Sequence, residues 1–242
     1  MSTKPHHIQV GGLLVGVVRK NIKHMHLAVY PPKGRVRVAV PLRIDDEAVR
    51  LAVTTRLAWI RKHQRKFEGQ DRQTVREYVS RESHYFKGRR YLLNVIEHDG
   101  RAKVELNGKP AIDLYVPKGA RRAKREKVLQ EWYRQELKAQ IPALIEKWEK
   151  VLNVSVAQWG VKRMKTRWGT CNVLARRIWI NLEIAKKPFQ CLDYIIVHEM
   201  VHLLERKHNA NFVALMNKFL PSWKALRQTL NSYPLKHESW EY

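Results

Sequence analysis

Cysteine is scarce in this chain: the 242 residues include only two, Cys171 and Cys191. Two cysteines cannot build the disulfide framework that small secreted proteins use in place of a large core. The chain is also long enough to bury a substantial core without such cross-links. We therefore expect two free thiols and a protein of a reducing compartment, the cytoplasm.

Long apolar runs are missing as well, which argues against a membrane-spanning helix, because such a helix needs about 20 apolar residues. The segment Ile8–Val18 has the length of the apolar core of an export signal. It contains Gln9 and paired glycines, however, and no small-residue cleavage site follows it. We therefore expect a buried strand here, and neither an export signal nor contact with a membrane.

Acidic residues are few: 22 Asp and Glu stand against 47 Lys and Arg, which gives a formal net charge of +25. The excess is spread along the chain, since residues 1–118 carry 24 basic and 11 acidic side chains. A folded body with this charge attracts polyanions at low salt. The sequence has no recognised nucleic-acid-binding motif, so the association with nucleic acid that we predict is non-specific.

The N-terminal half, residues 1–118, has the pattern of a small, mostly antiparallel sheet with one helix. Apolar and polar residues alternate from Arg35 to Pro41, which is the period of a half-buried strand. A helix is expected from Asp45 to Phe67, with acidic residues at its start. No internal repeat is visible. Further strands are expected at His24–Val29, Tyr91–Ile96, Ala102–Leu106 and Ile112–Val116.

Pro117-Lys118-Gly119 predicts the boundary to a second half, residues 119–242, in which helices dominate. A long helix is expected from Arg121 to Leu152, because apolar residues recur there every three or four positions. Short strands are expected from Val154 to Glu183. One more helix should follow Pro188, and another should run from Asn209 to just before Pro221. The predicted fold class is therefore α+β.

The helix after Pro188 carries the motif that indicates chemistry, His198-Glu199-Met200-Val201-His202. Side chains four positions apart lie on one face of a helix, so both imidazoles can reach one metal ion. Glu199 lies one step round the helix, where it can take a proton from a water held by that ion. The helix is apolar nearly all round and should be buried, and a metal ion would satisfy its otherwise unpaired polar groups.

His208 is the expected third ligand, because the residues after His202 suffice to end the helix and turn back. Glu205 is an alternative, since it lies seven residues after His198 on the same face. Its carboxylate would point along the helix axis, so we predict that it orients a histidine N–H instead. Three protein ligands leave a fourth position for water, which is typical of catalytic zinc sites. Imidazole ligands favour one Zn²⁺ ion over magnesium or calcium.

Four stretches resemble the YgjP-like metallopeptidases, which are related to the SprT and Spartan group and to the gluzincin-like peptidases. These stretches are Met164–Cys171, Ile178–Leu182, Asp193-Tyr194 and His198–Phe212, and weaker similarity extends to Trp59-Ile60 and to Glu131-Trp132-Tyr133. Thr170, where the family usually has serine, keeps the hydroxyl group. Val213, where the family often has tryptophan, changes the packing expected beneath the third ligand.

The resemblance implies a zincin-like catalytic half and a zinc peptidase that acts on protein or peptide substrates. It implies His198, His202 and His208 as zinc ligands and Glu199 as the catalytic base. Together with the basic charge, the kinship with SprT-type proteins suggests that the substrates are proteins bound to nucleic acid.

Two further residues are candidates for binding substrate. Arg167 could bind a carboxylate or phosphate or stabilise an oxyanion, although it could also pair with a structural acid. Gly169 beside it would allow a tight turn or a close approach of the backbone. Asn181, at the end of a short strand, is expected on the edge with which an extended peptide would pair.

Two other functions remain open at this point. A metal-dependent phosphohydrolase that acts on nucleoside triphosphates would use the same ion in basic surroundings. A non-enzymatic, basic nucleic-acid-binding module would use zinc only to hold its fold. Replacing Glu199 by glutamine separates the enzymes from the module, because only an enzyme would lose hydrolysis while it kept its zinc.

Overall fold

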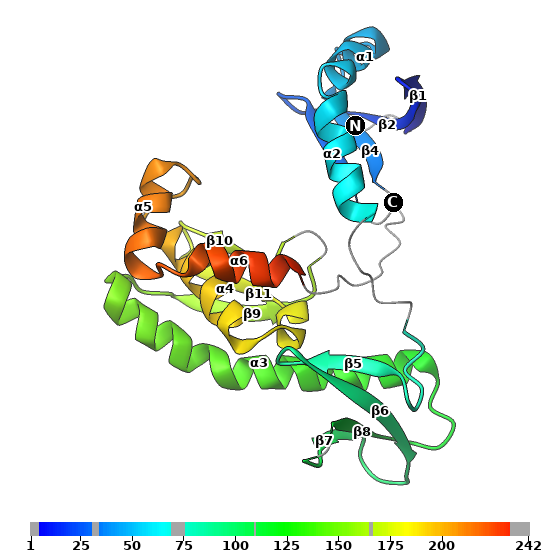
Figure 1. Cartoon of the computed structure of the whole chain (residues 1–242), viewed down its shortest axis with the longest axis vertical. Helices are drawn as coiled ribbons and strands as arrows, with labels where there is room; N and C mark the ends of the chain where they lie inside the picture. The colour runs from blue at the N-terminus through cyan, green and yellow to red at the C-terminus, as the bar shows by residue number, and fades with distance from the viewer. Residues whose placement is uncertain (1–4, 31–33, 69–75, 109, 165–166, 233–242) are drawn as a thin grey trace. The chain divides into compact units, whose positions relative to one another are not determined.

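The computed structural model describes residues 5–30, 34–68, 76–108, 110–164 and 167–232 (Figure 1). The described residues form two compact units, one within residues 5–68 and the other within residues 76–232. The boundary predicted at residue 118 falls inside the second unit, between a strand and the helix that packs against its sheet. In the described part of the chain, no helix is long and apolar enough to cross a membrane.

The first unit is a four-stranded sheet with two helices. The strands are β1 (His6–Val10), β2 (Leu13–Lys20), β3 (His26–Tyr30) and β4 (Arg35–Pro41), in the order β1-β2-β4-β3. The apolar segment predicted as one buried strand forms β1 and β2, which are joined by a turn at Gly11 and Gly12. Both glycines have positive φ angles, +55° and +79°, which side chains rarely tolerate.

The helix predicted from Asp45 to Phe67 is divided into α1 (Asp46–Thr54) and α2 (Leu57–Glu68). Asp45 caps α1, since its carboxylate accepts a hydrogen bond from the backbone N–H of Ala48 at 2.8 Å. The two helices pack against the sheet, and together they enclose a hydrophobic core that belongs to this unit alone. This core contains Ile8, Val10, Val15, Val17, Val36, Val38, Val40, Val49, Val53 and Ile60.

A second four-stranded sheet opens the second unit: β5 (Ser83–Phe86), β6 (Arg89–Glu97), β7 (Lys103–Leu106) and β8 (Ala111–Val116). Its order, β5-β6-β8-β7, repeats the topology of the first sheet, with the same antiparallel, parallel and antiparallel pairings. The turn between its first two strands again has two positive φ angles, at Lys87 and Gly88. The chain therefore contains a structural repeat that its sequence does not reveal.

The long helix α3 (Arg122–Leu152) joins this sheet to the rest of the unit. It packs against β7 and β8, and also against a third sheet and the helix α4 (Phe189–Val201), which follow it in the chain. The hydroxyl of Tyr133 donates a hydrogen bond to the carbonyl of Tyr85 at 2.8 Å, which ties α3 to β5. The apolar positions predicted to face a core, including Leu129, Leu137 and Trp148, are buried.

The third sheet has the order β10-β11-β9, formed by β9 (Gln158–Lys162), β10 (Gly169–Asn172) and β11 (Arg177–Asn181). The 3₁₀-helix η1 (Leu182–Lys186) leads into the helices α4 (Phe189–Val201), α5 (Ala210–Phe219) and α6 (Trp223–Ser232). Helix α4 packs against α3, β10, β11, α5 and α6, so it lies at the centre of the unit (Figure 1). The protein is α+β, and Cys171 and Cys191 are free thiols, as predicted.

The start of α4 is held by the second sheet. The backbone N–H groups of Lys87 and Gly88, in the β5–β6 turn, donate hydrogen bonds to the carbonyls of Ala185 and Lys186. A Cβ atom at Gly88 would lie 2.8 Å from Cγ of Pro188, the N-cap of α4. The turn therefore fixes where the central helix begins.

Candidate metal centre

His198 and His202 occupy the last turn of α4. Helix α4 begins after Pro188, as predicted, and its regular part ends at Val201, so His202 is the C-cap residue. His202 keeps helical backbone angles, φ −63° and ψ −18°. Its ring therefore stays one turn above that of His198, as the motif requires.

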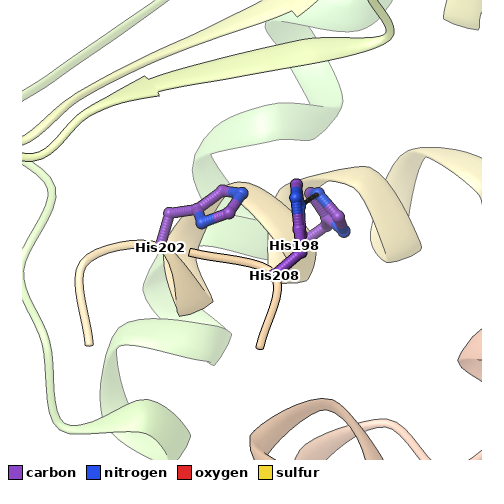
Figure 2. Close-up of side chains that lie close together, drawn as sticks. All are labelled: His198, His202 and His208. Atoms are coloured by element: carbon purple, nitrogen blue, oxygen red, sulfur yellow. Dashed lines mark hydrogen bonds between the residues drawn. The ribbon is translucent and has the colours of Figure 1, made fainter. Parts of the chain in front are cut away.

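His208 brings its ring to the same point from the segment between α4 and α5 (Figure 2). The three imidazoles each offer one ring nitrogen, and these nitrogens all lie within 4.8 Å of one another. The Nε2 atoms of His198 and His208 are 3.0 Å apart. Within the residues that the structure describes, this is the group of His, Cys, Asp and Glu side chains that could hold a metal ion.

Phe212 contacts the rings of all three histidines. Its ring centroid lies 5.0 Å from that of His198, 4.8 Å from that of His202 and 4.7 Å from that of His208. Phe212 is buried in the first turn of α5, where its backbone N–H is capped by the side chain of Asn209. The departure from the family pattern at Val213 leaves this aromatic contact in place.

The hydrogen bond of His202 decides which of its nitrogens is available. Nδ1 of His202 lies 3.1 Å from the backbone carbonyl oxygen of Glu205. A carbonyl can only accept, so Nδ1 carries the proton and Nε2 keeps a free lone pair. The group that meets the His202 ring is therefore the backbone carbonyl of Glu205, whereas the prediction assigned this role to its side chain. Its carboxylate turns away and accepts a hydrogen bond from the N–H of Lys207 at 3.0 Å.

Burial lowers the pKa of two of the three histidines, which favours their neutral form. Desolvation, with the neighbouring rings of His202 and His208, lowers the pKa of His198 to about 3. Desolvation also lowers the pKa of His202. Nδ1 of His198 is buried and has no hydrogen-bond partner among the described residues. Neutral imidazoles with free lone pairs are the form that binds metals.

The cluster fits a zinc ion. Tetrahedral zinc with Zn–N bonds of about 2.0–2.1 Å holds its ligand nitrogens about 3.3 Å apart. The 3.0 Å spacing of the two Nε2 atoms and the 4.8 Å limit on the whole set bracket this value, so small side-chain rotations suffice. The donor set, three imidazoles without thiolates, leaves a coordination position open for water or substrate.

Glu199 is buried beside this cluster, at 5% exposure. It lies directly against strand β10, where a Cβ atom at Gly169 would approach its Oε1 to 2.6 Å and its Cγ to 2.7 Å. The close backbone approach predicted for Gly169 is therefore made to the carboxylate itself. Desolvation raises the pKa of Glu199 to about 8, and the charge of Arg167 counteracts part of this rise. The carboxyl group is thus poised to hold or release a proton near neutral pH.

Arg167 is exposed and lies near enough to Glu199 to act on its charge. It is positioned by its backbone carbonyl, which accepts a hydrogen bond from the side chain of Asn181 at 2.7 Å. Trp168 next to it is partly buried against the core, with the ammonium of Lys187 5.4 Å from its ring centroid.

Asn181 does not lie on a sheet edge, contrary to the prediction, because β11 is the middle strand between β10 and β9. Its buried amide is used internally. Nδ2 donates to the carbonyls of Met164 and Arg167, and Oδ1 accepts from the N–H groups of Met164 and Glu183. Among the described residues, β10 pairs with β11 only, so its other edge is open, and β10 packs against α4.

Sequence reasoning did not find Arg227, on α6. Its charge lowers the pKa of His198 and acts against the rise in the pKa of Tyr194, so it lies near both residues. No local pattern distinguishes this arginine from the many others in the chain. Only the packing of α6 against α4 brings it to the site.

The chain matches a family model described as YgjP-like, metallopeptidase domain, over residues 23–233. The match includes all three histidines and Glu199, and it begins within the first compact unit. The comparison with curated proteins finds no match.

Proposed function

Because the chain belongs to the YgjP-like metallopeptidase family, we propose that it is a zinc-dependent peptidase whose single Zn²⁺ is held by His198, His202 and His208. The observation that carries this proposal is the convergence of three ring nitrogens within 4.8 Å beside a buried carboxylate. When bound, a zinc ion would polarise the scissile carbonyl and lower the pKa of a water molecule.

The residues around the cluster would carry the proton chemistry. Glu199 would accept a proton from the attacking water and pass it to the leaving amine. Its burial against Gly169 fixes the carboxylate and excludes bulk water from it. The positive charge of a bound ion would lower the raised pKa of Glu199, which favours the ionised base.

Arg167 is the proposed partner of negative charge on the substrate or on the tetrahedral intermediate. It is exposed, cationic and close to Glu199, which supports this role. Asn181 would act as a positioning residue, because it holds the carbonyl of Arg167 and does not face the substrate. Glu205 would orient His202 through its carbonyl.

An extended peptide could pair with the free edge of β10, which lies against α4. The net charge of +25 supports a salt-dependent affinity for nucleic acid as a secondary property. The two free thiols support the cytoplasm as the compartment.

The test combines metal analysis with a change of the base. Purified protein should contain one zinc ion per chain, and Glu199→Gln should retain that zinc. The same variant should lose casein hydrolysis by at least about a hundredfold. Glu146→Gln, a surface change on α3, should behave like the unchanged protein. Nucleoside triphosphates and a DNA-bound protein serve as further substrates.

Two outcomes would contradict the proposal. Casein hydrolysis at the normal rate by Glu199→Gln would show that this carboxylate is not the base. Zinc-dependent hydrolysis of nucleotides with none of casein would identify a phosphohydrolase.

A further inference from the structure

The first unit contains a hollow that includes none of the three histidines. Its volume is about 500 Å³, and it lies between the start of β3 and the corner where α1 meets α2. It is lined by Met25, His26, Leu27, Thr55, Arg56 and Trp59. All of these belong to the first compact unit.

Trp59 is the most conspicuous lining residue. It is 43% exposed, although the next residue, Ile60, is fully buried in the core of the unit. Its ring meets that of His63, one turn along α2, with the centroids 4.4 Å apart. With Met25 and Leu27 it gives the hollow apolar walls. Tryptophan at the wall of a surface hollow is typical of binding sites, where it supplies a large apolar contact area.

The strand beside the hollow lies at the edge of its sheet. In the order β1-β2-β4-β3, the last strand pairs with β4 only, within the described part of the unit. The backbone N–H and C=O groups on its other side can therefore pair with an added strand. Side chains of β3 line the hollow. A strand added beside β3 would therefore bring its own side chains to the hollow.

The positive charge of the first unit favours an acidic segment as the added strand. Residues 1–75 carry 15 Lys and Arg against 5 Asp and Glu. At the hollow, Arg56 and His26 are exposed, and none of the described residues that line it is acidic. A ligand with carboxylates beside an apolar side chain would complement this surface.

We propose that this hollow is a docking site for an extended, acidic protein segment, which would pair with β3 and insert an apolar or aromatic side chain against Trp59. Arg56 would bind a carboxylate of the segment. The inference rests on the proposed function only in one respect: for a peptidase, this segment would belong to the substrate, and the hollow would bind a part of it other than the part that is cleaved.

A peptide fits the hollow better than single-stranded nucleic acid does. Sites for single strands stack successive bases on several aromatic side chains. Here Trp59 and the His26 imidazole are the rings among the six lining residues, and Met25 and Leu27 form the remaining wall. An aliphatic wall and an open strand edge suit a peptide side chain and a peptide backbone.

Binding can be measured without hydrolysis on the full-length Glu199→Gln protein. The probe is a fluorescein-labelled dodecapeptide that alternates glutamate with leucine and has one central phenylalanine. Fluorescence anisotropy should show saturable binding. Trp59→Ala should weaken it about tenfold, as expected for loss of a tryptophan anchor. Arg56→Glu should weaken it by a similar factor, and this loss should shrink at high salt.

Arg65→Glu is the matched control, because it makes the same charge change on α2 outside the hollow. It should change the affinity less than twofold. Equal affinity for the Trp59→Ala, Arg56→Glu and unchanged proteins would overturn the proposal. So would Trp59-dependent binding of a twelve-residue oligothymidylate with no binding of the peptide. Arg56 is exposed, so the Arg56→Glu protein is expected to fold. It therefore still tests the proposal if Trp59→Ala does not fold.

The two proposals fail in different ways. If the protein hydrolyses nothing, the binding experiment still decides whether the hollow takes a peptide. If the hollow binds no peptide, hydrolysis of a short uncharged peptide at the metal centre is unaffected. When both hold, Trp59→Ala should slow cleavage of casein and leave the short peptide unchanged.

Discussion

Gly169 and Glu199 lie so close together that a side chain at position 169 would displace the carboxylate of Glu199. A Cβ atom at position 169 would come within 2.6 Å of Oε1 and 2.7 Å of Cγ of Glu199. Gly169 is the first residue of β10, and Glu199 lies in the last turn of α4. The contact therefore holds the carboxylate against β10. This strand is itself held by hydrogen bonds to β11, the middle strand of the sheet.

Gly169→Ala is accordingly expected to displace the carboxylate of Glu199. A shift of about 1 Å in a catalytic group can lower a rate about a hundredfold. We expect that loss in casein hydrolysis, with zinc content unchanged. Gly16→Ala is the control, because a Cβ atom there has its nearest neighbours at an ordinary 3.7 Å. Full activity of Gly169→Ala would show that Glu199 tolerates displacement or is not the base.

Glu205→Gln is expected to leave zinc affinity unchanged, although removing a group that orients a histidine usually costs 10- to 100-fold. The reason is that His202 is oriented by the carbonyl of Glu205, which this substitution keeps. Competition with a zinc chelator measures the affinity. His208→Ala is the comparison and should weaken it strongly. A tenfold loss in Glu205→Gln would mean that the carboxylate moves to the histidine when zinc binds.

Asn181→Ala should lower both stability and activity. The amide satisfies backbone groups of Met164, Arg167 and Glu183, and leaving buried groups unpaired costs roughly 1–3 kcal/mol each. Chemical denaturation should show a loss of about 3 kcal/mol in the free energy of unfolding. The control is Asn172→Ala, whose exposed side chain accepts one bond, from the N–H of Ala175. A stable Asn181→Ala protein with normal activity would contradict the positioning role.

His84 should make stability depend on pH. Its burial lowers the pKa to about 3 from an ordinary 6.5. Between these values the unfolded chain binds a proton that the folded protein does not, so stability falls as the pH falls. From pH 7 to pH 5 this amounts to about 2 kcal/mol.

His84→Gln, neutral at every pH, should therefore flatten the dependence measured by denaturant unfolding. Other groups contribute equally to both proteins, so the difference between the two curves reports His84 alone. Parallel curves between pH 5 and pH 7 would mean that His84 is protonated in the folded state or is not buried there.

Local patterns in the sequence predicted the long helix, the helix with the histidines and the fold class. They succeeded where spacing along one element decides the outcome, as for Leu129 to Trp148 in α3 and for His198 and His202 in α4. The family expected from the motifs near the histidines is also confirmed. The catalytic role of Glu199 and the identity of the metal stay predictions.

Features set by distant contacts could not be read in this way. Pairing of β2 with β4, and of β6 with β8, joins segments that are not consecutive, so the repeated topology left no local signal. Asn181 was expected at an edge because nothing local shows that β10 pairs beside it. The break at Thr55 and Arg56 was also missed, because the apolar periodicity continues across it without interruption.

His208 lies outside α4, and Asn209 directly after it caps α5. An ion held by both His198 and His208 would therefore tie the end of one helix to the beginning of the next. Closing this short loop restricts the unfolded chain, and binding free energy becomes folding free energy. The same ion would thus have both a catalytic and a structural role. Removing it with a chelator would then destabilise the segment between α4 and α5 and expose that segment to proteolysis.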